Sequence, residues 1–234
     1  MKSQMTNQEK FRLFFSARLK TLSPEDELIW LSSEVPVDAL RAAYPLGIFP
    51  WPGDHPDLFP WVCPTHRGIL PLARFHLGKS TRRQLRKAAF TVTFDQAFPD
   101  IIQSCSDLRA AETWIHPKMI AAYTDAHRQG FAHSVEVWQD NQLVGGLYGI
   151  DSGHMFSGES MFHRIPNAGK AAISALIDRL QSRGNRFLDI QQLTPHMQAM
   201  GAIEVDRTHF NHLLRQVRHQ AQHQTRTRHQ HPEF

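Results

Sequence analysis

The sequence has only two cysteines, and it has no apolar run approaching the about 20 residues that a membrane helix needs. Cys63 and Cys105 lie far apart and form no CxxC pair, which excludes a disulfide framework and favours reduced thiols. The start, MKSQMTNQEKFRLFFSARLK, interrupts its short apolar patch with arginine and lysine, unlike a signal peptide. The sequence therefore predicts a cytoplasmic protein.

Catalytic signatures of several enzyme classes are also missing. The chain has 15 histidines but no HExxH motif and no compact group of cysteine and histidine, so we expect no metal site. It has no GxSxG motif either, and no cysteine paired with a local histidine signature. Covalent catalysis by serine or cysteine is therefore disfavoured.

Positive charge is concentrated rather than abundant, since the net charge is only +4. One concentration is GKSTRRQLRKAAF, whose basic residues recur at the i, i+3, i+4 spacing of one helix side: Lys79, Arg82, Arg83, Arg86 and Lys87. Charge alone leaves two interpretations open, a solvated helix face and a nucleic-acid contact. The other concentration is the His-, Gln- and Arg-rich tail, which has little to bury.

The order of elements along the chain predicts the fold class. Seven prolines between residues 45 and 71 predict an irregular lid or linking region after a short helix in VPVDALRAAY. The strand FTVTF, the helix PKMIAAYTDAHRQG and an antiparallel meander of HSVEVWQD, QLVGGLYGI and GHMFSGESMF follow. A helix in NAGKAAISALIDRLQSRG, with Asn167 as its cap, then leads to the strand RFLDIQQL, and TPHMQAMG and AIEVD close the order as a short helix and a strand.

A strand, a helix and a second strand in one sheet make those two strands parallel, so the meander ends in one parallel pair. This predicts an α+β fold with a mixed sheet, a GNAT-like acyltransferase domain, in which the parallel strands splay apart. Acetyl-CoA enzymes of this fold carry a glycine-rich phosphate loop at the start of the following helix. Here that place reads RIPNAGKAA, with the single Gly169, so acetyl-CoA is disfavoured as the donor.

Three polar side chains are candidates for chemistry. Asp189 and Gln191 share one face of FLDIQQ because side chains alternate along a strand, and Glu159 in FSGESMF points into the same gap if the two strands are neighbours. Clustered carboxylates suit an incoming primary amine. The alternative is structural: Asp189 bonds a loop N–H or pairs with Arg186 or Arg164.

Six segments together resemble the bacterial leucyl/phenylalanyl-tRNA protein transferases: AYPLGIFPW, TWIHPKMIAAY, HSVEVW, LVGGLYG, FSGESMF and LDIQ. They lie in order between about residue 44 and about residue 210. The resemblance implies an aminoacyltransferase that moves leucine or phenylalanine, and less often methionine, from aminoacyl-tRNA to proteins with N-terminal lysine or arginine. It implies that the products enter N-end rule degradation.

The resemblance also implies roles for matching residues. Asp189, with Gln191, would orient or deprotonate the attacking α-amine, and Glu159 would hold the amino group of the aminoacyl moiety. Leu147, Phe156, Leu176 and Leu188 would form the apolar pocket for the donor side chain. Trp51 and Trp114 would contact the terminal adenosine, and the basic residues Lys79 to Lys87 would contact the acceptor stem. An aminoacyl ester is already activated, so we expect no cofactor and no metal, and we expect a monomer without a membrane partner.

We predict residues 1–70 to be a small N-terminal domain with its linking loop, 71–217 the catalytic domain and 218–234 a disordered basic tail. The chain departs from the resemblance at LIWLSSEVPVDAL, where a glycine-rich turn is usual, and at Thr194, where asparagine is common. Three alternatives stay open: an aminoacyl-tRNA-dependent GNAT-like transferase with another acceptor, an acetyl-CoA acetyltransferase, and a non-enzymatic tRNA-binding protein.

Overall fold

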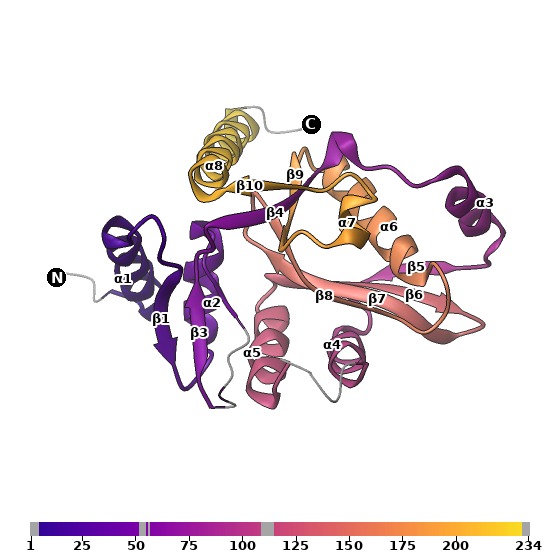
Figure 1. The fold of residues 1–234 in the computed structure, drawn as a ribbon, viewed down its shortest axis with the longest axis horizontal. Coiled ribbons are helices and arrows are strands. Elements are labelled where there is room, and N and C mark those ends of the chain that lie inside the picture. The colour runs from indigo at the N-terminus through magenta and orange to yellow at the C-terminus, as the bar shows by residue number, and fades with distance from the viewer. Residues whose placement is uncertain (1–4, 52–54, 56, 109–114, 231–234) are drawn as a thin grey trace.

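The computed structural model describes residues 5–51, 55, 57–108 and 115–230, with side chains up to residue 219. Its strands form a three-stranded sheet in the order β1-β3-β2 and a seven-stranded sheet in the order β10-β4-β9-β8-β7-β6-β5 (Figure 1). The larger sheet is mixed, because β8 and β9 pair in parallel and its other strand pairs are antiparallel. The predicted α+β class with a mixed sheet is confirmed.

The smaller sheet lies beside the N-terminal helices. The elements of this part are α1 (Asn7–Thr21), β1 (Leu28–Ser32), α2 (Val37–Ala43), the 3-10 helix η1 (Tyr44–Leu46), β2 (Phe49–Pro50) and β3 (Phe59–Val62). Helix α1 begins with a capping box in which the Thr6 side chain accepts from the Glu9 N–H and the Glu9 carboxylate accepts from the Thr6 N–H. The short helix predicted in VPVDALRAAY is confirmed as α2.

The expectation that residues 45–71 are irregular is wrong. They contain β2, β3 and β4 (His66–Pro71), and β4 lies inside the larger sheet between β10 and β9. Strand β3 accommodates Pro60 because its carbonyl still accepts a hydrogen bond from the Trp51 N–H at 2.7 Å, while Phe59 and Trp61 are buried on the opposite side of the pleat. The prolines obscured the period-2 pattern of these strands.

The larger sheet holds the remaining strands: β5 (Thr91–Phe94), β6 (Ala132–Gln139), β7 (Gln142–Asp151), β8 (Phe156–His163), β9 (Phe187–Gln191) and β10 (Ile203–Asp206). Helices connect and cover them: η2 (Leu72–Arg74), α3 (Lys79–Lys87), α4 (Phe98–Asp107), α5 (Pro117–Arg128), α6 (Ala168–Ser182), α7 (Pro195–Gln198) and α8 (Arg207–Gln230). Helix α6 lies on one face of the sheet, and α4 and α5 lie on the other (Figure 1).

The predicted meander is confirmed. Strands β6 and β7 form a hairpin whose turn residues Asp140 and Asn141 have φ of 50° and 60°, as a type I′ turn requires. Asn167 takes the N-cap position of α6, but its side chain makes no capping bond and donates to Gln84 Oε1 of α3 at 2.9 Å. The predicted cap is therefore right in position and wrong in interaction.

Strands β8 and β9 pair over a very short distance. Helix α6 connects them, and only two residue pairs are in register, Phe156 with Leu188 and Ser157 with Asp189. Beyond these pairs the ladder stops, although β8 continues to His163. This is the splayed parallel pair of the predicted GNAT-like domain, and the split begins immediately after Asp189.

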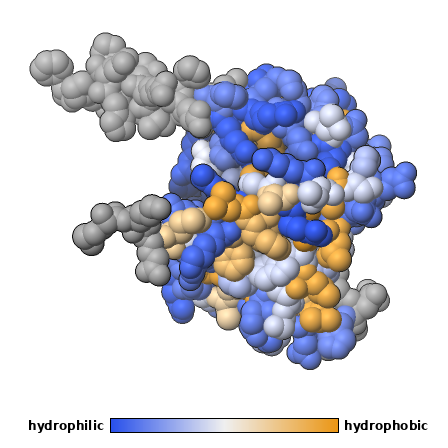
Figure 2. Space-filling model, turned by 90° about the vertical axis from the view of Figure 1, so that its left-hand side faces the viewer, coloured by the Kyte–Doolittle hydropathy of each residue, from blue (hydrophilic) through white to orange (hydrophobic). Residues whose placement is uncertain are grey.

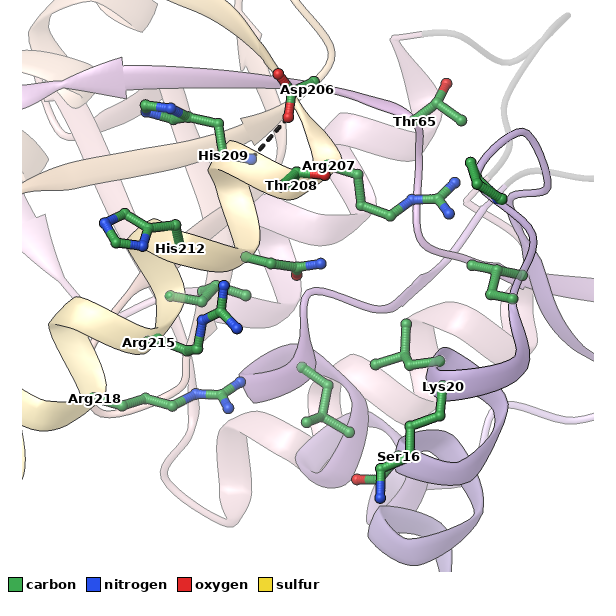
Figure 3. A pocket seen from close by; sticks show the side chains of 16 residues that line it. Ser16, Lys20, Thr65, Asp206, Arg207, Thr208, His209, His212, Arg215 and Arg218 are labelled. Atoms are coloured by element: carbon green, nitrogen blue, oxygen red, sulfur yellow. Dashed lines mark hydrogen bonds between the residues drawn. The ribbon is translucent and has the colours of Figure 1, made fainter.

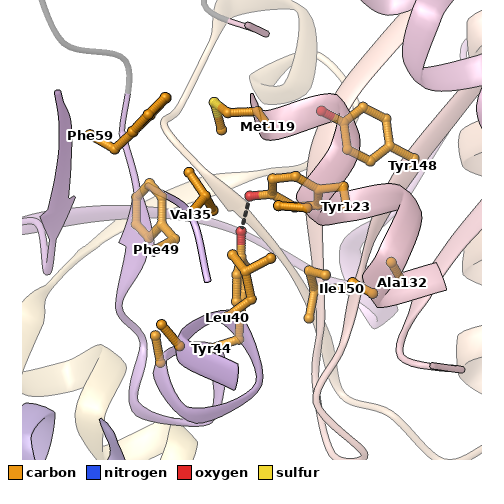
Figure 4. Close-up of a cluster of buried hydrophobic side chains, with 14 of the residues drawn as sticks. Val35, Leu40, Tyr44, Phe49, Phe59, Met119, Tyr123, Ala132, Tyr148 and Ile150 are labelled. Atoms are coloured by element: carbon orange, nitrogen blue, oxygen red, sulfur yellow. Dashed lines mark hydrogen bonds between the residues drawn. The ribbon is translucent and has the colours of Figure 1, made fainter. Parts of the chain in front are cut away.

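The core lies in three clusters. One fills the space between the smaller sheet, α2 and α5, where Phe49, Tyr44, Tyr123 and Tyr148 lie among aliphatic side chains (Figure 4). A second lies between α6 and the larger sheet, and a third lies under α8 around Phe210. The first cluster joins the N-terminal elements to the sheet, so it fixes η1 and β2 relative to β8 and β9.

The predicted domain division stays a prediction. Strand β4 crosses the expected boundary at residue 70, and α8 crosses the expected start of the tail at residue 218. Among the described residues, no helix combines the length and the apolar character needed to cross a membrane.

Candidate active site at the divergence of β8 and β9

Glu159 lies where the two parallel strands separate, and it is hydrogen-bonded on both carboxylate oxygens. The hydroxyl of Tyr123 donates to Oε2 at 2.9 Å, and Gln191 Nε2 donates to Oε1 at 2.8 Å. The Tyr44 hydroxyl shares a hydrogen bond of 2.6 Å with the Tyr123 hydroxyl (Figure 4). The side-chain bond from Gln191 thus joins β8 to β9 at a point where their backbones no longer pair.

Burial governs the charge of Glu159. The residue is 9 % exposed, and burial raises the pKa of its carboxyl to about 7, against the opposing effect of the two tyrosine hydroxyls. Burial also raises the pKa of Tyr44 and of Tyr123 well above the usual value, so both stay protonated donors. Glu159 therefore has neutral partners and can hold or release a proton near neutral pH.

Asp189 is enclosed more completely. It is 0 % exposed, and Arg67 binds it in a bidentate manner, with Nε–Oδ1 of 2.8 Å and Nη2–Oδ2 of 2.7 Å. Ser157 Oγ donates to Oδ2 at 2.8 Å, and the Gln191 N–H donates to Oδ1 at 3.1 Å. Four donors thus occupy the carboxylate, which has about four acceptor positions in total.

Arg67 is the partner that the sequence analysis missed. Arg164, one of the two expected partners, donates instead to the Leu143 carbonyl and to Ser104 Oγ. Arg67 is 1 % exposed, and its guanidinium lies 4.3 Å from the ring centroid of Phe49 and 4.7 Å from that of Phe210. The sequence offered one indication of a buried ion pair, a single arginine in the apolar segment HRGILP. This segment was not predicted to be a strand, so the indication was missed.

Gln191 has a strained backbone. Its φ is 63°, in the left-handed region that non-glycine residues rarely adopt, and its N–H is held by Asp189. The side-chain amide is thereby directed to Glu159. The predicted convergence of Glu159, Asp189 and Gln191 is confirmed, but it depends on this local turn and on Arg67 as well as on strand alternation.

The four predicted pocket residues also come together. Leu147 on β7, Phe156 on β8, Leu176 on α6 and Leu188 on β9 are 3–5 % exposed and belong to one apolar cluster. The cavity against Phe156 and Leu176 has a volume of about 20 Å³. That volume holds about one water molecule, and Leu147 and Leu188 do not line it, so a leucyl or phenylalanyl side chain enters this cluster only if its residues move.

The predicted donor-binding tryptophans differ in status. Trp51 is half-buried beside β3 and meets the Phe49 ring edge to face, with centroids 5.5 Å apart. Trp114 lies outside the described residues.

The predicted basic helix is confirmed as α3. It buries none of its residues, and its five basic side chains, Lys79, Arg82, Arg83, Arg86 and Lys87, are all exposed. Helix α3 lies at the end of the molecule opposite α1 (Figure 1).

The start of α6 follows the first splayed strand, which is the place of the donor-phosphate loop in acetyl-CoA enzymes of this fold. A Cβ at Gly169 would lie 2.9 Å from Met161 Sδ, so this glycine serves close packing of α6 on β8. Across the part of the chain that the structure describes, no group of three His, Cys, Asp or Glu side chains is arranged to hold a metal ion.

Comparison with known proteins gives consistent matches. The family model described as leucyl/phenylalanyl-tRNA protein transferase matches residues 69–215. Curated relatives named leucyl/phenylalanyl-tRNA–protein transferase include one from Rhizorhabdus wittichii, 46% identical over 76% of this chain and 73% of its own length. Another, from Hydrogenovibrio crunogenus, is 39% identical over 85% of this chain and 78% of its own length.

Among solved structures, that of FemX covers 86% of this chain and 75% of its own, with 13% identity and a TM-score of 0.47. A ribosomal-protein-alanine N-acetyltransferase from Brucella melitensis covers 42% of this chain and 75% of its own, with 17% identity and a TM-score of 0.30.

Proposed function

The chain belongs to the leucyl/phenylalanyl-tRNA–protein transferase family, and we propose that it moves leucine or phenylalanine, and less often methionine, from aminoacyl-tRNA to an acceptor protein. The acceptors proposed are proteins with N-terminal lysine or arginine, marked in this way for N-end rule degradation in the cytoplasm. The observation that carries the proposal is the convergence of Glu159, Gln191 and Asp189 at the split between β8 and β9, beside an apolar cluster.

The donor side chain is proposed to enter among Leu147, Phe156, Leu176 and Leu188. These residues surround the point where the strands separate, and Phe156 directly faces Leu188 in the parallel pair. Because the existing cavity is small, binding requires the cluster to open, which favours a conformational step before chemistry. Glu159 lies three residues beyond Phe156 on β8, and its carboxylate is proposed to bind the donor's amino group.

Asp189 is proposed to orient rather than to deprotonate. Its acceptor positions are taken by Arg67, Ser157 and the Gln191 N–H, which leaves none for an incoming amine. Its effect passes through Gln191, whose backbone it holds and whose amide contacts Glu159. Asp189 is thus a positioning residue in this proposal.

The reaction needs one proton acceptor. The acceptor's α-amine attacks the ester carbonyl carbon, the new C–N bond forms as the C–O bond to the tRNA ribose breaks, and the ribose oxygen takes the proton that the amine nitrogen loses. An acceptor that starts as an ammonium ion releases one further proton to reach the nucleophilic amine. Glu159, with a pKa of about 7, is the group proposed to accept it.

The tRNA is proposed to lie along α3. Five exposed cations on one short helix suit the phosphate backbone and give a salt-dependent affinity with little sequence preference. The aminoacyl ester supplies the driving force, so the proposal includes no cofactor and treats the enzyme as a monomer.

Transfer of labelled leucine, phenylalanine and methionine from charged tRNA to peptides that differ only in an N-terminal Arg, Lys or Ala tests the function. We expect transfer to the Arg and Lys peptides alone. Transfer that ignores the N-terminal residue, or no transfer although charged tRNA binds, would favour the alternative, an aminoacyl-tRNA-dependent transferase with another acceptor.

A further inference from the structure

A large cleft separates α1 from the beginning of α8, on the side of the molecule away from α3. Its volume is about 1180 Å³, above the range typical of small-ligand sites, so it has room for a segment of a chain. Ser16 and Lys20 of α1 form one wall, and Arg215 and Arg218 of α8 face them across the cleft (Figure 3). We call this the α1–α8 cleft.

The α1–α8 cleft is electropositive. Among the described residues that line it, Asp206 is the single acid, and the lysine and arginine residues are Lys20, Arg207, Arg215 and Arg218, with His209 and His212 beside them. The Asp206 carboxylate is engaged, since it accepts from the His209 N–H at 2.8 Å at the start of α8. The Arg207 guanidinium is engaged too, with the carbonyls of Pro64, Ser23 and Asp26. Lys20, Arg215 and Arg218 are left to bind an anion.

Arg218 points most directly to a missing anion. Its Nε is buried and has no hydrogen-bond partner in the part of the chain whose side chains are described. Burial lowers its pKa below the usual value, and Arg12 of α1 lowers it further. A partly buried guanidinium that faces another cation is unfavourable unless an anion binds beside it.

The lining distinguishes between kinds of anion. Single-stranded nucleic acids are bound by basic grooves that also carry aromatic side chains for base stacking, whereas the described lining here has no Phe, Tyr or Trp, and its aromatic rings are the imidazoles of His209 and His212. The floor is aliphatic, with Leu19, Leu22, Leu46 and Leu214. Figure 2 shows this side of the molecule, where hydrophobic side chains form a band bordered by hydrophilic ones. Arginines above an aliphatic floor suit carboxylates and apolar side chains on one peptide.

The α1–α8 cleft is linked to the candidate active site by a short series of contacts. A Cβ at Gly47 would lie 2.9 Å from the Phe210 ring and 3.2 Å from Leu214 Cδ1, so α8 packs directly on this turn. The Gly47 carbonyl accepts from Arg67 Nη1 at 3.1 Å, and Arg67 binds Asp189. The helix that forms one wall of the cleft thus packs, through Gly47 and Arg67, against the ion pair of the candidate active site.

We propose that the α1–α8 cleft binds an acidic, partly apolar segment of the acceptor protein, downstream of the N-terminus that is modified. This inference rests on the proposed function, because that function makes a protein the acceptor. The position agrees with it, since α3, the proposed tRNA contact, lies at the opposite end of the molecule (Figure 1). Acceptors would then be selected by a downstream acidic stretch as well as by their first residue.

Fluorescence anisotropy with the full chain tests this binding without any chemistry. Two labelled peptides share an N-terminal Arg and the same apolar residues, and one carries downstream Asp and Glu where the other carries Asn and Gln. We expect the acidic peptide to bind roughly tenfold more tightly, with a preference that shrinks as salt is added. Arg215→Gln with Arg218→Gln should abolish the preference, whereas Arg128→Gln, an exposed site on α5, should retain it.

The outcomes separate the inferences. Equal binding of the two peptides by the unchanged chain, or a preference that survives the double substitution, overturns the proposal. Loss of tRNA affinity rather than peptide preference in the double variant overturns it in favour of a nucleic-acid site. Removal of the Arg218 charge relieves repulsion with Arg12, so the melting temperature of the double variant should not fall. If it does fall, Arg215→Gln alone, at an exposed position, is tested instead for loss of the preference for the acidic peptide. Absence of transfer with an intact acidic preference refutes only the proposed function.

Discussion

The buried ion pair of Arg67 and Asp189 gives the sharpest test of how the candidate active site is held together. Both residues are almost fully enclosed, at 1 % and 0 % exposure, and two direct hydrogen bonds join them. Arg67→Met leaves Asp189 with Ser157 Oγ and the Gln191 N–H but without a countercharge. Breaking one side of a buried pair costs about 3–5 kcal/mol, which lowers the melting temperature of a chain of this size by about 10 °C.

The double variant carries the decisive comparison. Asp189→Asn alone leaves the Arg67 guanidinium buried between two rings without a countercharge, with the Gly47 carbonyl and a neutral amide oxygen as acceptors, so it should also cost about 3 kcal/mol or more. Arg67→Met combined with Asp189→Asn removes both charges, and we expect its cost to fall about 3 kcal/mol short of the sum of the single costs. Urea unfolding of the four proteins measures this coupling.

An additive result, with the double variant as destabilised as the sum of the singles, would refute the claim that the charges compensate each other. A functional readout extends the test. If Asp189 acts through Gln191, Asp189→Ala should reduce transfer strongly while tRNA affinity is nearly unchanged. Equal loss of transfer and of tRNA binding would show that Asp189 only maintains the fold.

Three further predictions concern the proton acceptor, the tRNA contact and the donor pocket. Because burial raises the pKa of Glu159 in the folded state to about 7, the contribution of this carboxyl to stability is full below its ordinary pKa and is lost as pH rises through 7. The loss in the free energy of unfolding is up to about 3 kcal/mol. Glu159→Gln should therefore flatten the pH dependence of both the free energy of unfolding and the rate of transfer. A transfer rate of the unchanged protein that keeps rising up to pH 9 would exclude Glu159 as the proton acceptor. Charge reversal at Arg82 and Arg83 should weaken tRNA binding and reduce its logarithmic salt slope by roughly one to two, and an unchanged slope would remove α3 from the tRNA path. Leu176→Ala should cost about 2–5 kcal/mol and raise phenylalanine transfer relative to leucine, measured with the two charged tRNAs in competition; an unchanged ratio would place the donor side chain elsewhere.

Local sequence patterns were sufficient for the meander and for the crossover from β8 to β9. Alternation in HSVEVW and QLVGGLYGI, with Asp140 and Asn141 between them, predicts a hairpin because the two turn residues tolerate positive φ. The parallel pair follows from the rule that a strand, a helix and a strand in one sheet cross over. These elements depend mainly on residues close in sequence.

The features that sequence reasoning missed depend on residues distant in sequence. Arg67 and Asp189 are 122 positions apart, and Tyr44 and Tyr123 are 79 positions apart. Nothing near Arg67 indicates a partner, and its strand was hidden among prolines. Ser157 was likewise passed over, because a small polar residue in a strand has no distinguishing pattern until the parallel register places it beside Asp189.

The splayed strands explain why so many polar groups are buried at one place. Where β8 and β9 stop pairing, the backbone ladder can no longer bind the strands together, and side chains take over that role. Gln191 binds Glu159 across the opening, and Ser157 binds Asp189 just before it. A substrate that enters the opening must displace or join these side-chain bonds, not backbone bonds. The same separation that costs the sheet its hydrogen bonds thus supplies exchangeable polar partners at the site where the proposed transfer would bring a donor, an amine and a proton together.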